Sequence, residues 1–151
     1  MLVYRISKCK YIEDLSGLGA ATYPGRWNGK GTYVLYTAAT PSLALLESVV
    51  HISNIPTIPY CMISIEIPDN SIEEISVKDL PDGWQVNPPA DDLKEIGNRF
   101  VSEGKYLALK IPSALMPEEF NVILNPNHPD FKKVKIVSNR SLSIDERLLK
   151  K

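Results

Sequence analysis

The sequence predicts a single α+β domain with a mixed or antiparallel sheet and a few helices. The chain has 151 residues, about the length of one domain, so we expect one domain over residues 1–151. Six short segments carry the alternating or β-branched patterns of strands, whereas only two carry a helical repeat. Strands and helices do not alternate along the chain, which argues against a doubly wound fold.

The first predicted strand covers residues 2–6, where larger apolar side chains alternate with Val3 and Arg5. Five further strands are expected from alternating apolar, β-branched or aromatic residues. They cover residues 32–37, 60–67, 106–111, 120–124 and 134–138. The glycine-rich residues 13–31 are predicted to be loop.

The first predicted helix runs over residues 43–51, with Thr40 as its N-cap and Pro41 in its first turn. Helical periodicity predicts a buried apolar stripe at Leu43, Leu46 and Val50. Glu47 falls on a second, more polar stripe with Ala44, Ser48 and His51.

The second predicted helix covers residues 91–103, with acidic residues in its first turn and Gly104 as its C-cap. The proline-containing residues 68–89 are predicted to be an extended connection with one short strand or turn around residues 73–77. The tail, residues 144–151, is expected to form a short basic helix.

The charge of the chain excludes some classes of partner. Seventeen Lys and Arg against 18 Asp and Glu give a formal net charge of −1, which supplies no broad basic surface for direct nucleic-acid or membrane binding. The amino terminus lacks the apolar run of a signal peptide, and no apolar stretch approaches the roughly 20 residues that span a bilayer. We therefore expect a cytoplasmic protein.

The two cysteines, Cys9 and Cys61, lie far apart without C-x-x-C spacing or nearby histidines. This pattern predicts neither a disulfide framework nor a zinc site. Both are expected to be free thiols in the core or at the surface, and no metal site is expected elsewhere.

The glycine-rich segment from Gly25 to Thr32 carries Arg26, whose planar guanidinium suits phosphate oxygens. The segment is not a Walker loop, because three residues rather than four precede its Gly-Lys pair and Gly31 replaces the Ser or Thr. A surface arginine beside a buried Trp27 remains the structural alternative.

Several short motifs occur in order along the chain. The first group comprises Gly25-Arg26-Trp27-Asn28, Gly31, Tyr36-Thr37-Ala38 and Ser42-Leu43-Ala44-Leu45-Leu46-Glu47. The second comprises Ile111 to Pro117, Asn121, and Leu124 to Phe131. With the opening Val3-Tyr4-Arg5, these blocks closely resemble the RES-domain toxins over most of the chain.

The resemblance implies a toxin of a toxin–antitoxin pair, with a core like that of ADP-ribosyltransferases and with NAD as substrate. It also implies an Xre-type helix-turn-helix antitoxin as partner. Arg26, Glu47 and Ser113 correspond to the residues that name the family, and Tyr36 and Asn121 are expected to assist them. A homo-oligomer and a toxin–antitoxin hetero-oligomer both remain open.

Each implied role has a chemical reason. Arg26 would hold the pyrophosphate of NAD, and Glu47 would stabilise the positive charge that develops when the nicotinamide–ribose bond breaks. Ser113 and Asn121 would bind the nicotinamide amide or a ribose hydroxyl. Tyr36, and also Tyr33 or Trp27, could stack on the cationic nicotinamide ring; for Tyr33 and Trp27 ordinary core packing is an equal alternative.

The leading hypothesis is therefore an enzyme that consumes NAD, with water or phosphate as acceptor. One alternative is a protein ADP-ribosyltransferase that modifies a host enzyme. Another is a non-catalytic module that binds a nucleotide or the antitoxin. A basic cluster formed by Lys132, Lys133, Lys135 and Arg140 is interpreted as a solvated face or as a contact for a DNA-binding partner.

Overall fold

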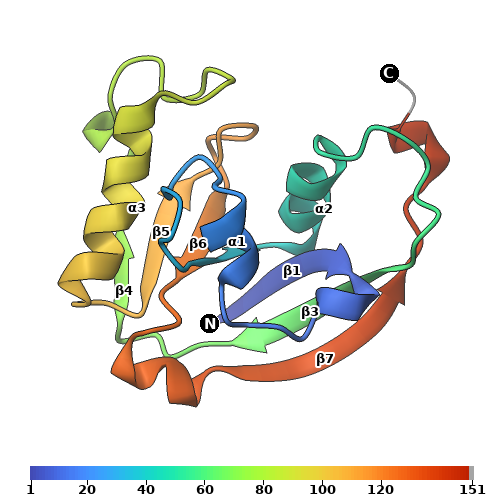
Figure 1. Ribbon diagram of the computed structural model, residues 1–151, viewed down its shortest axis with the longest axis horizontal. Helices are drawn as coiled ribbons and strands as arrows, with labels where there is room; N and C mark the ends of the chain where they lie inside the picture. Colours follow the sequence, from blue (N-terminus) through green and yellow to red (C-terminus); the bar gives the residue numbers. More distant parts are fainter. Residues whose placement is uncertain (150–151) are drawn as a thin grey trace.

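The computed structural model describes residues 1–149. Within this range the strands form one seven-stranded sheet in the order β4-β5-β6-β2-β1-β3-β7 (Figure 1). All neighbouring strands are antiparallel except β4 and β5, which are parallel. The strands are β1 (Leu2–Lys8), β2 (Leu35–Ala38), β3 (Tyr60–Glu66), β4 (Ile72–Glu74), β5 (Ala108–Pro112), β6 (Phe120–Leu124) and β7 (Lys135–Leu142). The predicted α+β class with a mixed sheet is confirmed.

Three α-helices accompany the sheet within the described residues. They are α1 (Leu18–Thr22), α2 (Pro41–Val49) and α3 (Asp91–Glu103). In Figure 1, α3 lies along the β4–β5 end of the sheet, α2 lies above β1, and α1 lies between them. The core under α3 contains Leu93 and Phe100 packed against Leu109, Ile111 and Ile123.

Helix α2 begins as predicted. Thr40 caps it by accepting a hydrogen bond from Leu43 N at 3.1 Å, and Pro41 occupies the first turn. The predicted apolar stripe is wrong, because Leu46 and Val50 are 38% and 40% exposed. The buried residues of α2 are Leu43, Ala44 and Val49.

The physical reason for this difference is the position of α2 over β1. Ala44 packs with Leu43 against Ala38 and against Tyr4 and Ile6 of β1. The small side chain of Ala44 therefore faces the sheet, and the stripe that carries Glu47 lies closer to the sheet than its polarity suggested.

Other predicted bounds differ in informative ways. Helix α3 and strand β6 have the predicted bounds, and Gly104 ends α3 with φ of 57°. The predicted loop 13–31 contains α1, which begins after Gly17 with φ of 77°. The second strand begins only at Leu35, because a turn closed by Thr32 N and Gly29 O at 3.1 Å occupies its predicted start.

The predicted carboxy-terminal helix is reduced to a single 3₁₀ turn over Glu146–Leu148. Its N-cap Asp145 accepts a hydrogen bond from Arg147 N at 2.9 Å. The last two residues of the predicted helix, 150 and 151, lie outside the described residues. Three other 3₁₀ turns within residues 1–149 are Cys9–Tyr11, Val77–Asp79 and Pro129–Lys133.

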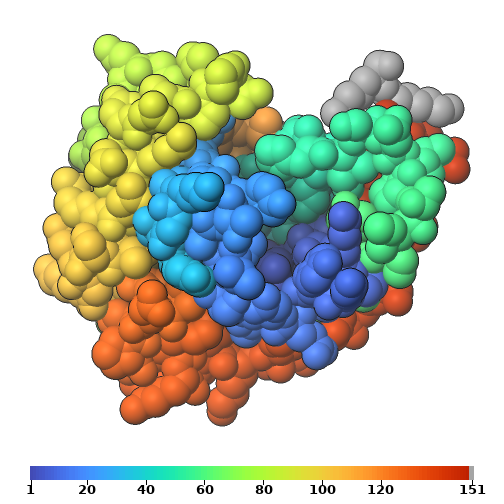
Figure 2. Space-filling view, in the orientation of Figure 1, coloured from blue at the N-terminus to red at the C-terminus, as the bar shows by residue number. Residues whose placement is uncertain are grey.

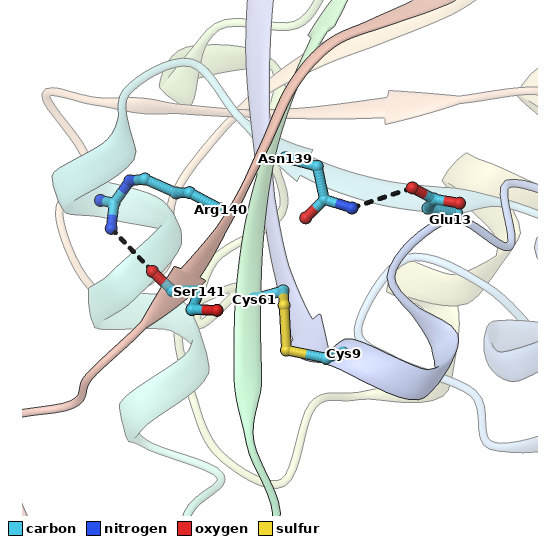
Figure 3. Close-up of a disulfide and its surroundings, with 6 residues drawn as sticks. All are labelled: Cys9, Glu13, Cys61, Asn139, Arg140 and Ser141. Atoms are coloured by element: carbon cyan, nitrogen blue, oxygen red, sulfur yellow. Dashed lines mark hydrogen bonds between the residues drawn. A yellow bond between two sulfur atoms is a disulfide. The ribbon is translucent and has the colours of Figure 1, made fainter.

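The prediction of two free cysteines is wrong, because Cys9 and Cys61 form a disulfide (Figure 3). Strands β1 and β3 pair antiparallel with Ser7 opposite Cys61, and Cys9 N donates to Pro59 O just beyond the strands. This register brings the two Cα atoms to 4.8 Å, within the range a disulfide spans. A separation of 52 residues does not reveal such pairing until the strand register is known.

No helix in residues 1–149 is long and apolar enough to cross a membrane.

Candidate functional site

A cleft of about 990 Å³ opens between the segment that follows α1 and helix α2, with β1 at its floor (Figure 2). Figure 2 shows it as a hollow between the blue segment and the teal helix. Five of the predicted site residues line it: Arg26, Trp27, Tyr36, Glu47 and Asn121. Ser113 and Tyr33 do not line it.

Glu47 lies on α2 at the side of the cleft. Its Oε1 accepts hydrogen bonds from Ser113 Oγ and from Asn121 Nδ2, both at 2.7 Å. The two donors come from the end of β5 and from β6, more than 60 residues along the chain. The carboxylate is therefore fixed in orientation by two side chains of the sheet.

Ser113 lies behind Glu47 rather than in the cleft. Its side chain is fully buried, and its Oγ also accepts hydrogen bonds from Leu115 N at 3.1 Å and Met116 N at 3.2 Å. Ser113 thus caps the turn after β5 and holds Glu47 at the same time. A direct contact between Ser113 and a ligand in the cleft is not what this geometry favours.

Arg26 reaches across to the loop between β4 and α3. One of its nitrogens, Nη1, donates to Trp84 O at 2.7 Å and to Val86 O at 2.9 Å. Burial lowers the pKa of Arg26, while the nearby Glu47 and Tyr36 partly oppose that shift. Within residues 1–149 its Nε and Nη2 donate no hydrogen bond, so they remain available to an anionic ligand.

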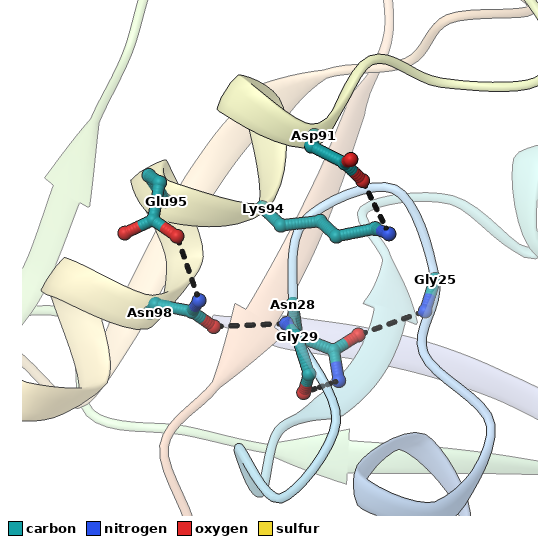
Figure 4. Close-up of polar contacts among 7 residues, drawn as sticks. All are labelled: Gly25, Asn28, Gly29, Asp91, Lys94, Glu95 and Asn98. Atoms are coloured by element: carbon teal, nitrogen blue, oxygen red, sulfur yellow. Dashed lines mark hydrogen bonds and ion pairs between the residues drawn. The ribbon is translucent and has the colours of Figure 1, made fainter.

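Asn28 organises the segment that carries Arg26 (Figure 4). Its side chain is fully buried, and its Oδ1 accepts from Gly25 N at 2.9 Å and from the Tyr36 hydroxyl at 2.7 Å. Its Nδ2 donates to three backbone carbonyls, the shortest bond being 2.8 Å to Ala20 O. Asn28 belongs to one of the motifs that resemble the family, but nothing in the sequence signals a buried amide, so no role for it was predicted.

The same segment also packs tightly against α3. Asn98 Oδ1 accepts a hydrogen bond from Gly29 N at 2.9 Å, which Figure 4 shows beside the Asn28 contacts. A Cβ atom at Gly97 would lie 1.7 Å from Trp27 O. Glycine is therefore required at position 97 for the backbone of the Arg26 segment to approach the helix.

The aromatic residues predicted to stack on a ligand occupy different environments. Tyr36 lines the cleft, but its hydroxyl is already used: it donates to Asn28 and accepts from Trp27 N at 3.1 Å. Burial raises the pKa of Tyr36 well above its usual range. Trp27 is almost fully buried against Trp84, with ring centroids 6.3 Å apart, and Tyr33 is 39% exposed outside the cleft.

Several residues line the cleft to which the sequence assigned no site role. Arg5 is the most informative, because its Nη1 donates to the carbonyls of Tyr11, Ile12 and Asp14. Burial lowers the pKa of Arg5, and the charge of Asp14 partly opposes this. A cation inside a predicted strand was the available signal. Gln85 and Asn87 also line the cleft.

The charged groups outside the cleft, over the described residues, bear on the question of a metal site and on the predicted basic cluster. Within residues 1–149, no three His, Cys, Asp or Glu side chains cluster as metal ligands would. In the basic cluster, Lys133 pairs with Asp130 at 2.7 Å and Arg140 donates to Ser141 O at 3.3 Å (Figure 3). Two of its four cations therefore already have partners in this chain.

The fold and the site together define a small α+β domain in which one cleft contains a hydrogen-bonded carboxylate, Glu47, and an arginine, Arg26. The family model described as "RES domain" matches residues 2–145. The chain belongs to the RES domain family of toxins.

Similar proteins agree with this assignment. "Toxin Res" of Photorhabdus laumondii is 38% identical over 153 aligned positions, covering 99% of this chain and 98% of that protein. "Prs ADP-ribosylating toxin" of Sphingobium sp. is 36% identical, covering 92% of this chain and 89% of that protein. The M. tuberculosis MbcT-MbcA toxin-antitoxin complex contains a chain with the same fold, at TM-score 0.79 and 13% identity, over 94% of this chain and 84% of that one.

Proposed function

We propose that this chain is a toxin that cleaves the nicotinamide–ribose bond of NAD, with water or phosphate as acceptor. The activity is assigned to one domain, residues 1–151. The observation that carries the proposal is the Glu47 carboxylate, oriented at the edge of the cleft by Ser113 and Asn121 at 2.7 Å each. Membership of a toxin family and an ADP-ribosylating relative support the use of NAD.

The chemistry requires one well-placed carboxylate. In NAD the nicotinamide nitrogen is cationic, so it departs as a neutral molecule with the electron pair of the glycosidic bond and needs no proton. Positive charge then develops on the ribose ring, as in glycoside hydrolysis. A negative carboxylate held in advance at that position stabilises the transition state without reorganising.

The acceptor completes the reaction. An oxygen of water or phosphate forms a bond to ribose C1 as the bond to nicotinamide breaks, and the proton of the acceptor passes to solvent. Arg26 would hold the pyrophosphate through the guanidinium nitrogens that Trp84 O and Val86 O leave free. Asn121 lines the cleft beside Glu47 and would contact the ribose or the nicotinamide amide.

The test is direct. Purified protein is incubated with NAD, with and without phosphate, and free nicotinamide and the ADP-ribose products are followed by chromatography. Nicotinamide release with ADP-ribose or its phosphorylated form supports the proposal and identifies the acceptor. Saturable NAD binding without nicotinamide release would favour either a required protein acceptor or the non-catalytic module.

A second candidate transfers ADP-ribose to a protein. It is favoured by the relative from Sphingobium sp., whose name describes an ADP-ribosylating toxin acting on Prs. Mass spectrometry of a lysate treated with the toxin and NAD separates the candidates, because only transfer adds ADP-ribose to a protein.

An antitoxin partner follows from the family. The structural neighbour comes from a toxin-antitoxin complex, and we propose an Xre-type helix-turn-helix protein as the partner of this chain. Co-expression and co-purification of the toxin with a candidate Xre-type antitoxin, followed by the NAD assay on the complex, tests this assignment.

A further inference from the structure

The segment between β5 and β6 contacts α2 at two places. One is the Glu47 carboxylate, held by Ser113 and Asn121. The other is the start of the helix, where Thr40 Oγ1 donates to Glu119 Oε2 at 2.6 Å. The helix is therefore held near its first residue and again at Glu47, seven residues further on.

Thr40 has a double role in this second contact. Its hydroxyl oxygen accepts a hydrogen bond from Leu43 N at 3.1 Å, and the same hydroxyl donates a hydrogen bond to the Glu119 carboxylate. The Glu119 carboxylate thus fixes the rotamer in which Thr40 caps α2. A negative group at this helix end is also favourable, because the exposed N–H groups give it partial positive charge.

The two contacts are joined by the backbone of the segment itself. Ser113 N donates to Glu119 O and Glu119 N donates to Met116 O, both at 2.9 Å. Ala39 N donates to Phe120 O at 2.9 Å, which ties the residue before the cap to the start of β6. Ser113 and Glu119 therefore belong to one closed turn, and Asn121 follows it directly in β6, so the backbone fixes the three residues relative to one another.

We propose that Glu119 is a positioning residue, which acts through Thr40 to set the place of Glu47 in the cleft. Glu119 does not line the cleft, so we expect it to make no direct contact with NAD. Without Glu119, the side-chain tie at the start of α2 is lost and only the backbone bond from Ala39 N to Phe120 O remains there, so the alignment of Glu47 becomes less precise. A misplacement of about 1 Å at a reacting centre can cost on the order of a hundredfold in rate.

The proposal rests on the proposed NAD cleavage for its kinetic test. Glu119→Ala should lower kcat by about tenfold to a hundredfold and change the KM for NAD by less than about twofold. Glu119→Gln should restore most of kcat, because its carbonyl still accepts from Thr40. The matched control is Glu118→Ala, which alters the exposed neighbouring glutamate and should leave kcat unchanged.

A double-substitution cycle shows whether Glu119 acts through Thr40. In a Thr40→Val background, Glu119→Ala should have little further effect on kcat. If the two residues acted independently, the fold-reductions in kcat of the two substitutions would multiply. Equal kcat for Glu119→Ala and the unmodified protein overturns the proposal. So does a loss of kcat that Glu119→Gln fails to restore.

Hydrogen exchange tests whether the contact between Glu119 and Thr40 holds α2 in place, even if the proposed function is wrong. Amides 43–48 of α2 should exchange faster in Glu119→Ala than in Glu118→Ala, with the rest of the chain unchanged. If the unmodified protein cleaves no NAD, the proposed function fails, but the exchange rates still show whether Glu119 positions α2 through Thr40. Equal exchange in the two variants overturns that role.

Discussion

The Arg26 segment and helix α2 present opposite charges to one cleft, but they are held in different ways. Arg26 lies in irregular backbone whose shape depends on the buried Asn28 amide and on close packing against Gly97. Glu47 lies on a regular helix, and two side chains orient its carboxylate. Substitutions on the helix side should therefore change the rate of the reaction, and substitutions on the loop side should change stability and ligand binding.

The largest effect expected from this comparison is that of Glu47→Gln. The amide can still accept hydrogen bonds from Ser113 and Asn121, so the geometry is kept while the negative charge is lost. The rate of nicotinamide release should fall by about 10²–10³, with little change in Tm.

The matched control for this prediction is Glu118→Gln, which removes an exposed carboxylate from the same region. It should cleave NAD at the unmodified rate. If Glu47→Gln also cleaves NAD at that rate, the assigned role of the carboxylate is wrong.

The next largest effect is expected on the loop side, at Gly97. The added methyl group of Gly97→Ala would lie 1.7 Å from Trp27 O, so the Arg26 segment must move away from α3. Overpacking of this kind costs about 1–3 kcal/mol, which lowers Tm by several degrees, and the affinity for NAD should fall with it.

Gly19→Ala is the control for this packing argument. Nothing lies within 4 Å of a Cβ atom at Gly19 in α1, and alanine favours the helix by about 0.5–1 kcal/mol. Thermal denaturation should therefore show a lower Tm for Gly97→Ala and a higher Tm for Gly19→Ala than for the unmodified protein. A Tm for Gly97→Ala equal to that of the unmodified protein would show that the segment is not fixed by this contact.

The same contrast explains what could be predicted from the sequence. Thr40, Pro41 and the helical repeat predicted α2, and the bounds of α3 and β6 were correct, because local propensity and periodicity determine these elements. The convergence of Arg26, Glu47 and Asn121 on one cleft is consistent with the family resemblance.

The errors arose where contacts between distant segments decide the outcome. The exposed side of α2 depends on which residues meet β1, and the Cys9–Cys61 disulfide depends on the register of β1 and β3. The roles of Asn28 and Glu119 likewise depend on partners that are remote in the sequence or in irregular backbone. Periodicity carries no information about such partners.

A smaller effect is expected at Tyr36, where the two sides of the comparison meet. Tyr36→Phe removes the hydroxyl that donates to Asn28 and accepts from Trp27 N. Trp27 N would then lack its acceptor, while Asn28 Oδ1 would keep only the bond from Gly25 N. The loss should cost about 1–3 kcal/mol and raise the KM for NAD more than it lowers kcat. Tyr33→Phe is the control. The Tyr33 hydroxyl makes no hydrogen bond within residues 1–149 and its side chain is exposed, so this substitution should leave both Tm and KM unchanged.

The smallest expected effect is the pH dependence of the contribution that the Tyr36 hydroxyl makes to the free energy of unfolding. Burial raises the pKa of Tyr36, so the unfolded chain loses this proton first, near the ordinary tyrosine value of about 10. The contribution of Tyr36 to stability is then complete below about pH 10 and is lost as the pH rises toward the higher folded pKa, by up to about 1.4 kcal/mol per pH unit. Urea denaturation from about pH 7 to 11 should show a constant difference in the free energy of unfolding between the unmodified protein and Tyr36→Phe up to about pH 9. Above about pH 10 the difference should narrow, since phenylalanine does not titrate. A difference that stays constant to pH 11 would mean that the Tyr36 hydroxyl is not shielded from solvent, and that the Arg26 segment is held more loosely than the helix side of the cleft.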